Sequence, residues 1–178
     1  MYFQNISRKL LTSFLLFAPC LAYADDDLSS RIFYSYESNG ADYISSIGAG
    51  TTFKNLESNL GFQLNMSIGN ANVLATDGYL EEFTVWQGSA KFGYFSNFSV
   101  YIEGGIDLSE AIFHDIRYDD YDHQTGYEDD IDAFVGMGAG IRAGALGIDA
   151  FFRVREIDAE YWEAESEVFS GVQISVNF

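Results

Sequence analysis

Apolar and polar residues alternate along most of this chain after residue 28, in segments of about ten residues. In residues 60–69 the apolar members are Leu60, Phe62, Leu64, Met66 and Ile68, separated by Gly61, Gln63, Asn65, Ser67 and Gly69. Because successive side chains of a β-strand point to opposite faces of a sheet, this alternation predicts strands with one apolar and one polar face. It predicts eight of them, at residues 29–37, 43–54, 60–69, 82–94, 98–109, 133–142, 146–155 and 167–178.

The connections between these segments also alternate. Those after the second, fourth and sixth segments are short, whereas those after the third, fifth and seventh are long, polar and rich in Asp and Glu. The first connection, at residues 38–41, is short as well and departs mildly from the pattern. An even strand number with tight turns and longer loops is typical of a transmembrane β-barrel. The sequence therefore predicts an all-β fold, an up-and-down antiparallel eight-stranded barrel whose two ends lie on the short-turn side.

The expected dimensions fit a membrane. A strand of about 10 residues rises roughly 33 Å, and a tilt of about 40° reduces this to about 25 Å, the height of the apolar band of outer-membrane barrels. Closing the sheet also pairs every backbone N–H and C=O, as lipid requires. The alternative is a soluble, lipocalin-like barrel, whose apolar faces would point inward around a ligand.

The basic residues favour the membrane barrel. Six fall on the polar face of an expected strand: Arg31, Lys54, Lys91, Arg142, Arg153 and Arg155. If it faced lipid at the middle of the bilayer, each of these side chains would destabilise the barrel by about 2–4 kcal/mol. A barrel of this size is just wide enough to be filled by its own side chains. We therefore expect a packed lumen with a charge network formed by Lys91, Glu103, Asp107, Arg142, Asp149, Arg153 and Arg155.

The short turns predict neighbours within this network. A turn near Gly144 would place Arg142 opposite Gly147 and diagonal to Asp149, within reach of a long side chain. Since both charges would be largely desolvated, we expect them to pair.

A second turn, near Ser96, would bring Lys91 close to Tyr101 and diagonal to Glu103. Aromatic residues close to the turns are expected to form a girdle at the membrane interface. These are Tyr94, Phe95, Phe98 and Phe178.

The first 24 residues have the pattern of an export signal. Arg8 and Lys9 precede an apolar stretch too short to span a bilayer as a helix, and Ala22-Tyr23-Ala24 forms an A-x-A cleavage site. We expect residues 1–24 to be a cleaved secretory signal peptide and residues 25–178 to be the barrel domain. The alternatives are a retained anchor or lipidation of Cys20, although Pro19 does not suit a lipobox. Cleavage would remove the single Cys and the single Pro, so no disulfide is expected.

Acidic residues dominate the charge, with 27 Asp and Glu against 9 Lys and Arg. This balance argues against a nucleic-acid partner, which requires clustered basic residues. Many of the acidic residues lie in the long loops, and their carboxylates are the hard oxygen ligands that Ca²⁺ prefers. The loop group comprises Asp119, Asp120, Asp122, Glu128, Asp129 and Asp130, without calcium-loop spacing. We expect solvated acidic loops that could meet a host or surface ligand, with loose divalent binding as the alternative.

Two parts of the sequence resemble a known family. The run GMGAGIR, a short turn and the run LGIDAFFRV resemble the late paired strands of the small OmpA/OmpX/opacity-type outer-membrane barrels. The last strand, with Val172, Ile174, Val176 and terminal Phe178, resembles the sorting signal read by the barrel-assembly machinery. The resemblance implies an integral protein of the Gram-negative outer membrane, porin-like in architecture and in contact with lipid and lipopolysaccharide. We expect no periplasmic peptidoglycan-binding domain after the barrel, so the cell-wall tethering of OmpA proper is not part of what the resemblance implies.

The expected function is a structural or surface-interaction role, adhesin-like or in envelope integrity, without catalysis, cofactor or dedicated metal site. One alternative is an enzyme that modifies lipopolysaccharide, which would need a nucleophile, a base and an orienting group within reach. His114 and His123 are the only histidines, with Ser109 and Asp115 nearby, and they show no His-Ser pairing typical of lipid A deacylase barrels. The second alternative is a narrow pore.

Overall fold

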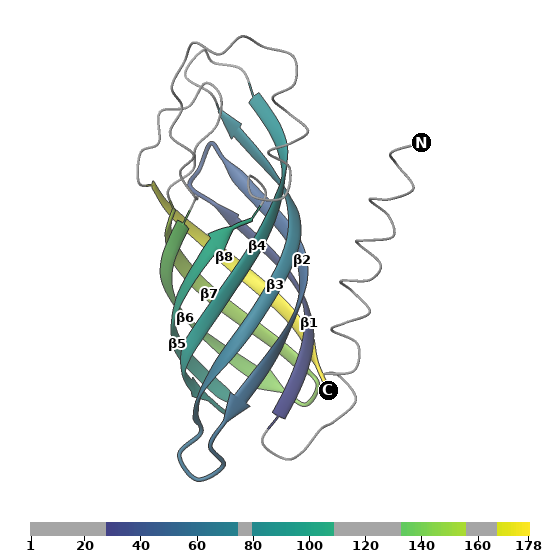
Figure 1. Ribbon diagram of the computed structural model, residues 1–178, viewed down its shortest axis with the longest axis vertical. Helices are drawn as coiled ribbons and strands as arrows, with labels where there is room; N and C mark the ends of the chain where they lie inside the picture. Colours follow the sequence, from purple (N-terminus) through teal and green to yellow (C-terminus); the bar gives the residue numbers. More distant parts are fainter. Residues whose placement is uncertain (1–27, 75–79, 109–132, 156–166) are drawn as a thin grey trace.

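The computed structural model describes residues 28–74, 80–108, 133–155 and 167–178, in which eight strands form one closed antiparallel barrel (Figure 1). Each strand pairs with its neighbours in sequence, and the last pairs with the first. The strands are β1 (Leu28–Ser38), β2 (Tyr43–Lys54), β3 (Leu60–Leu74), β4 (Leu80–Phe95), β5 (Phe98–Asp107), β6 (Ala133–Ala143), β7 (Leu146–Arg155) and β8 (Glu167–Asn177). The predicted fold class is confirmed. No described helix is long and apolar enough to cross a membrane.

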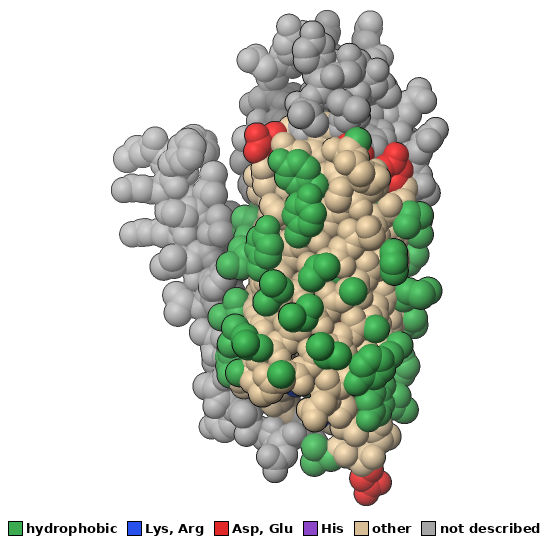
Figure 2. Space-filling view, turned by 180° about the vertical axis from the view of Figure 1, so that it is seen from behind, with side chains coloured by type: hydrophobic (Ala, Val, Ile, Leu, Met, Phe, Trp, Pro, Cys, Tyr) green, Lys and Arg blue, Asp and Glu red, His purple; other side chains and the backbone are tan. Residues whose placement is uncertain are grey.

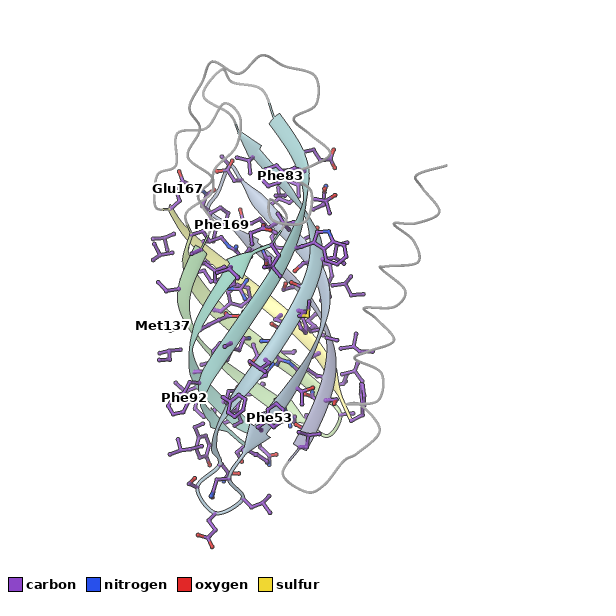
Figure 3. The ribbon with its side chains drawn as sticks, in the orientation of Figure 1. Phe53, Phe83, Phe92, Met137, Glu167 and Phe169 are labelled. Atoms are coloured by element: carbon purple, nitrogen blue, oxygen red, sulfur yellow. The ribbon has the colours of Figure 1, made fainter. Side chains whose placement is uncertain are left out.

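The outer face of the barrel is apolar. Figure 2 shows apolar side chains spread over the wall, with acidic side chains near its ends. Met137 and Phe92 project from the wall (Figure 3) and are 63% and 59% exposed. A continuous apolar surface of this kind is costly in water and suits contact with hydrocarbon. The soluble alternative, with its apolar faces inward, is therefore wrong.

Three short turns lie at one end of the barrel, together with the start of β1 and the C-terminus (Figure 1). In the β2–β3 turn, the Asn55 side-chain oxygen accepts hydrogen bonds from the backbone nitrogens of Glu57 and Ser58 at 2.9 and 3.1 Å. Gly144, in the two-residue β6–β7 turn, has φ +62, a conformation that favours glycine because it lacks a Cβ. The predicted arrangement of short turns and chain ends is confirmed.

β3 and β4 are longer than predicted. Their ladder continues past residue 69 to the pair Leu74 and Leu80, so part of the expected loop is strand. Here the apolar side chains change sides: Asn70 and Glu82 hydrogen-bond to each other on the exposed surface, whereas Ala71 and Val73 are fully buried. The outward apolar pattern ends at this point although the strands continue, so the sequence pattern did not show the extension.

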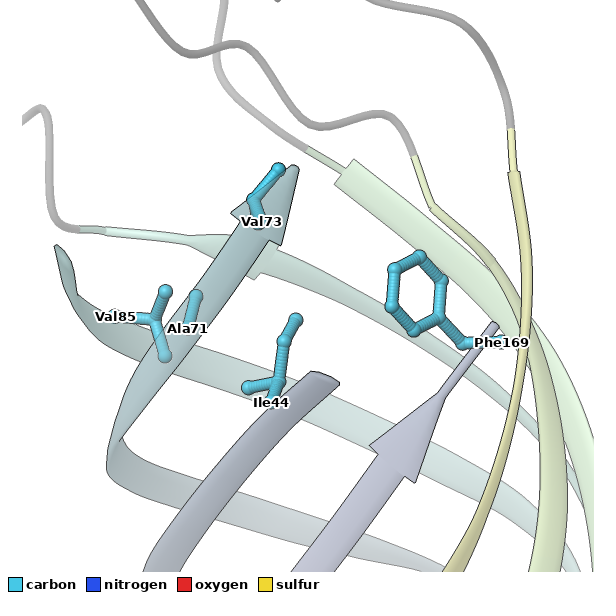
Figure 4. Packing of buried hydrophobic residues seen from close by; sticks show 5 residues of the cluster. All are labelled: Ile44, Ala71, Val73, Val85 and Phe169. Atoms are coloured by element: carbon cyan, nitrogen blue, oxygen red, sulfur yellow. The ribbon is translucent and has the colours of Figure 1, made fainter. Parts of the chain in front are cut away.

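The inward apolar residues form a cluster at the end opposite the short turns. It consists of Ile44, Ala71, Val73, Val85 and Phe169 (Figure 4). The partly buried Phe83 packs against it. Hydrophobic burial of this kind stabilises a water-surrounded part of a barrel as it does a soluble protein. The barrel therefore has an apolar exterior along most of its height and a small apolar core near this end.

The barrel interior as a candidate functional site

The inward faces of the strands carry buried ionic side chains in equal numbers of each sign. The cations are Arg31, Lys91, Arg153 and Arg155, and the anions are Glu37, Glu103, Asp107 and Asp149, none more than 9% exposed. A fifth buried anion, Asp42, lies outside the strands in the β1–β2 connection, where the Asn39 side-chain amide donates to it at 2.9 Å. A buried charge is costly unless it is paired and hydrogen-bonded. Balanced charge inside the barrel is therefore a condition for this interior to be stable.

Arg153 lies at the centre of the network. Its guanidinium binds Glu103 in a bidentate manner, with Nε to Oε2 at 3.0 Å and Nη2 to Oε1 at 2.9 Å. Its third nitrogen, Nη1, donates to Glu37 Oε1 at 3.0 Å. Arg155 donates from Nε to the other oxygen of Glu37 at 3.0 Å, and from Nη2 to Gln87 Oε1 at 3.3 Å. Two arginines and two glutamates thus join β1, β5 and β7 across the lumen.

Aromatic rings complete this packing. The Arg153 guanidinium carbon lies 4.2 Å from the centroid of the Phe151 ring and 4.7 Å from that of Phe134. A cation over an aromatic face gains electrostatic attraction, especially where water is excluded. The rings need small neighbours, because a Cβ at Gly105 would lie 2.2 Å from Cζ of Phe134. The inward glycines thus make room for aromatic rings in a narrow lumen.

Asp149 has a different partner from the one predicted. Arg142 does lie opposite Gly147, as expected. Asp149, however, forms its ion pair with Arg31 at 3.4 Å and accepts a hydrogen bond from Ser99 at 3.2 Å. Arg142 is half-buried and forms no ion pair within the described ranges. The predicted register of Arg142 and Asp149 is confirmed, and both line one cavity. The ion pair of Asp149 is nevertheless formed with Arg31 of β1, a strand that barrel closure places on the other side of β8 from β7.

Lys91 also has a corrected position. It lies directly opposite Glu103 and not diagonal to it, because the β4–β5 turn is centred on Asn97 and not on Ser96. The predicted closeness to Tyr101 is confirmed, since the Lys91 Nζ lies 4.1 Å from the Tyr101 ring centroid.

The Gln173 amide lies between Lys91 and Arg31. Its oxygen accepts from Lys91 Nζ at 3.3 Å in one orientation of the amide and from Arg31 Nη2 at 2.8 Å in the other. Because the amide has a single acceptor oxygen, it accepts from only one of these two cations at a time.

Several inward residues were not predicted as members of the network. Glu37 lies on the same face of β1 as Arg31, because the two are an even number of residues apart. This parity, the odd or even position of a residue along its strand, was the sequence signal that could have identified Glu37. Phe95 was expected in the outer girdle, but it is 6% exposed and stacks on Tyr101 with ring centroids 6.3 Å apart. It has the inward parity of Lys91. The other girdle residues, Tyr94, Phe98 and Phe178, are exposed on the outer wall.

The remaining predicted residues lie inside the barrel, on its outer wall or outside the described residues. Asp107 is buried at the end of β5, and its Oδ1 accepts from the Trp86 backbone nitrogen at 3.2 Å. Val172, Ile174, Val176 and Phe178 are each about half exposed on the outer face. Ala22 and Ala24, His114 and His123, and the acidic residues 115–132 lie outside the described residues. Within the described part of the chain, no group of three His, Cys, Asp or Glu residues could hold a metal ion.

Comparison with solved structures connects this geometry to known barrels. The Yersinia pestis outer-membrane protein Ail, in a phospholipid bilayer nanodisc, is 14% identical and matches 84% of this chain and 99% of its own, with a TM-score of 0.50. This chain has the fold of a small outer-membrane barrel. The N-terminal β-barrel domain of Pseudomonas aeruginosa OprF, also 14% identical, matches 84% of this chain and 97% of its own at a TM-score of 0.47.

A de novo designed transmembrane β-barrel, 10% identical, matches 88% of this chain and 98% of its own at a TM-score of 0.47. No protein-family model and no curated protein sequence matches the chain. The resemblance to small outer-membrane barrels that the sequence indicated is thus confirmed at the level of fold.

Proposed function

We propose that this outer-membrane barrel is a non-conducting, membrane-spanning scaffold that supports surface contacts or envelope integrity. The observation that carries the proposal is the filled, charge-balanced lumen inside an apolar wall. The wall suits hydrocarbon along its height, which supports integral insertion in the outer membrane after export. The surface role would then reside in the loops at the end opposite the short turns.

Side chains fill the lumen. Lys91, Gln63 and Gln173 are each 1% exposed, and the Arg153–Glu103 ion pair is buried as well. The apolar cluster around Phe169 fills the far end. An ion would have to displace paired charges and then cross an apolar layer. This arrangement supports a structural interior more than a pore.

Planar-bilayer recordings of the purified full-length protein test this proposal. We expect no stable conductance step, even at high voltage. Arg153→Ala, which would break the central pair, is the matched comparison, since a leak seen only in this variant would support the network as the obstruction. A steady open level in the wild-type protein would contradict the proposal and favour the narrow pore.

The proposed orientation puts the short turns in the periplasm and the acidic loops outside. There the carboxylates of residues 115–132 would face lipopolysaccharide phosphates, and Ca²⁺ or Mg²⁺ would be needed to bridge the like charges. Protease cleavage of these loops on intact cells should therefore increase when a chelator is added. Absence of any cleavage from outside would argue against this orientation. A pull-down from intact cells would then identify any host or surface ligand.

We also propose that the protein has no catalytic role. The histidine-dependent alternative predicts that His114→Ala changes the lipid A profile of the cell. We expect an unchanged profile by mass spectrometry. A lost or new lipid A species in this variant would favour the enzyme.

A further inference from the structure

A small polar cavity lies beside the central ion pairs. Its volume is about 10 Å³, and its lining includes Ser35, Ser67, Gln87 and Glu103. That volume is about one water-sized sphere, which is the least space that holds a single water molecule. An apolar cavity of this size stays dry, but a polar one binds water where several polar groups converge. The lining therefore decides what this cavity contains.

The side-chain amide of Gln87 has a hydrogen-bond donor for which no described residue provides an acceptor. The side chain is 5% exposed, and its Oε1 accepts from Arg155 Nη2 at 3.3 Å. Because Arg155 can only donate, this contact sets which end of the amide is oxygen. The opposite atom, Nε2, is buried and has no hydrogen-bond partner in the described part of the chain. A buried amide donor left without a partner costs about 1–3 kcal/mol, so such groups usually bind ordered water.

Two hydroxyl groups on the cavity wall have unused hydrogen-bonding capacity. Ser67 lies directly opposite Gln87 in the β3–β4 ladder, and its hydroxyl forms no hydrogen bond with the described residues. Ser35 shares one hydrogen bond with Ser46 at 2.7 Å, whereas a hydroxyl offers one donor and two acceptor positions. An unpaired donor and two available acceptors are the set that one water molecule satisfies.

We propose that this cavity binds a single ordered water molecule, which accepts from Gln87 Nε2 and donates to the hydroxyls of Ser67 and Ser35. The water is part of the folded barrel and links β1, β3 and β4 next to the Arg153–Glu103 pair. The site goes beyond the surface role proposed above. It distinguishes a packed interior with water bound in an enclosed cavity from a continuous column of water.

Water-selective NOE and ROE spectra of the isotope-labelled full chain in nanodiscs test the site. We expect cross-peaks between water and the Gln87 side-chain amide protons in both spectra. The NOE and ROE cross-peaks should have opposite signs, which is the signature of a bound water. Ser67→Val should abolish them, because its two methyl groups occupy the cavity while a β-branched residue suits a strand. The matched control, Ser67→Ala, removes the hydroxyl without filling the space and should retain weaker cross-peaks.

Three results would overturn the proposal. The first is a wild-type Gln87 amide without a water cross-peak, a test that requires no variant to fold. The second is equally strong water cross-peaks to the ring protons of Phe169, in the apolar cluster at the far end of the barrel, which would indicate a water column. The third is an unchanged Gln87 cross-peak in folded Ser67→Val. Lumen hydration is measured separately from surface binding, so either proposal can fail alone.

Discussion

Each buried ion in this barrel depends on a specific partner from another strand. Arg153 binds Glu103 of β5 through two nitrogens and Glu37 of β1 through the third. Glu37 keeps Arg155 if Arg153 is removed, but Glu103 would lose its bidentate partner. A single substitution at Arg153 therefore leaves one defined carboxylate without its ion pair.

We expect Arg153→Met to lower the free energy of unfolding by about 3–5 kcal/mol, the usual cost of leaving a buried charge unpaired. Adding Glu103→Leu should recover part of this loss, because neither position then carries a charge. Urea unfolding in detergent, followed by tryptophan fluorescence, measures both variants. Lys54→Met, at the half-exposed end of β2, is the control and should change stability by less than about 0.5 kcal/mol. Additive losses in the double variant would contradict this account of the pair.

Asp149 provides a second test of partner choice. Its ion pair is with Arg31, and Arg142 is the alternative cation near the same turn. In double-mutant cycles with Asp149→Ala, we expect a coupling energy of about 0.5–3 kcal/mol for Arg31→Ala. The matched cycle with Arg142→Ala should show a smaller coupling energy. Larger coupling to Arg142 would restore the pair predicted from the sequence.

At the scale of strands, the two faces exchange roles along the barrel. Phe169 of β8 is buried in the apolar cluster, whereas its neighbour Val168 is 61% exposed on the outer wall. Along most of the barrel height the outer face is apolar and the inner face ionic. Near the long-loop end, β3 instead carries polar Asn70 outside and apolar Ala71 inside. The strands therefore continue beyond the apolar band with an interior like that of a soluble protein.

Phe169→Ala should lower the free energy of unfolding by about 3–5 kcal/mol, because it removes a buried ring and leaves a cavity. Val168→Ala, one residue earlier, should cost much less, because detergent or lipid fills the space. Paired urea titrations of the two variants measure the difference. Equal losses would show that the cluster is not a packed core.

β8 closes the barrel by pairing with both β7 and β1. At its end, Phe178 and Ser30 exchange two backbone hydrogen bonds of 2.9 Å, and the Phe178 side chain faces outward. Deleting Phe178, or Phe178→Asp, should leave export intact but reduce the amount of folded protein in the outer membrane. Phe178→Leu, which keeps an apolar end, should assemble nearly normally. Heat-modifiable mobility in outer-membrane fractions measures folding, and normal levels of the deletion variant would exclude an assembly role.

At the scale of the whole molecule, charge is divided between interior and surroundings. The inward faces of the described strands balance four buried cations with four buried anions, whereas the complete chain has a formal net charge of −18. The excess acidity therefore lies outside the paired interior, in the acidic connections and near the expected mature N-terminus. Such a distribution favours solubility of the aqueous parts and does not disturb the lumen.

Processing tests the expected organisation of the chain. Cleavage after Ala24 should give a mature protein that begins at Asp25. Intact-mass analysis of the outer-membrane fraction measures this directly, with Ala24→Leu as the variant in which cleavage should be impaired. A mature mass that includes residue 20, with or without lipid, would show that the signal is not removed there.

The sequence by itself determined the strands and their faces, because the two-residue period of an extended chain converts alternation directly into sidedness. Arg153 and Asp149 were placed inward by parity alone, and the turn at Gly144 was enough to place Arg142 opposite Gly147. Parity also carried the signals for Glu37 and Phe95. The local sequence pattern was sufficient to predict the face of each side chain wherever lipid outside and a polar lumen inside require residues of opposite polarity.

Only the tertiary structure decided which inward side chains meet. Arg31 binds Asp149, 118 residues away in the sequence, and Arg153 binds Glu37, 116 residues away. These pairs form because barrel closure brings β1 close to β7 around one narrow lumen. A turn centred one residue later moved Lys91 to a position opposite Glu103 without changing its face. The extension of β3 and β4 was hidden for a related reason: beyond the apolar band, water replaces lipid outside and the polarity of both faces reverses.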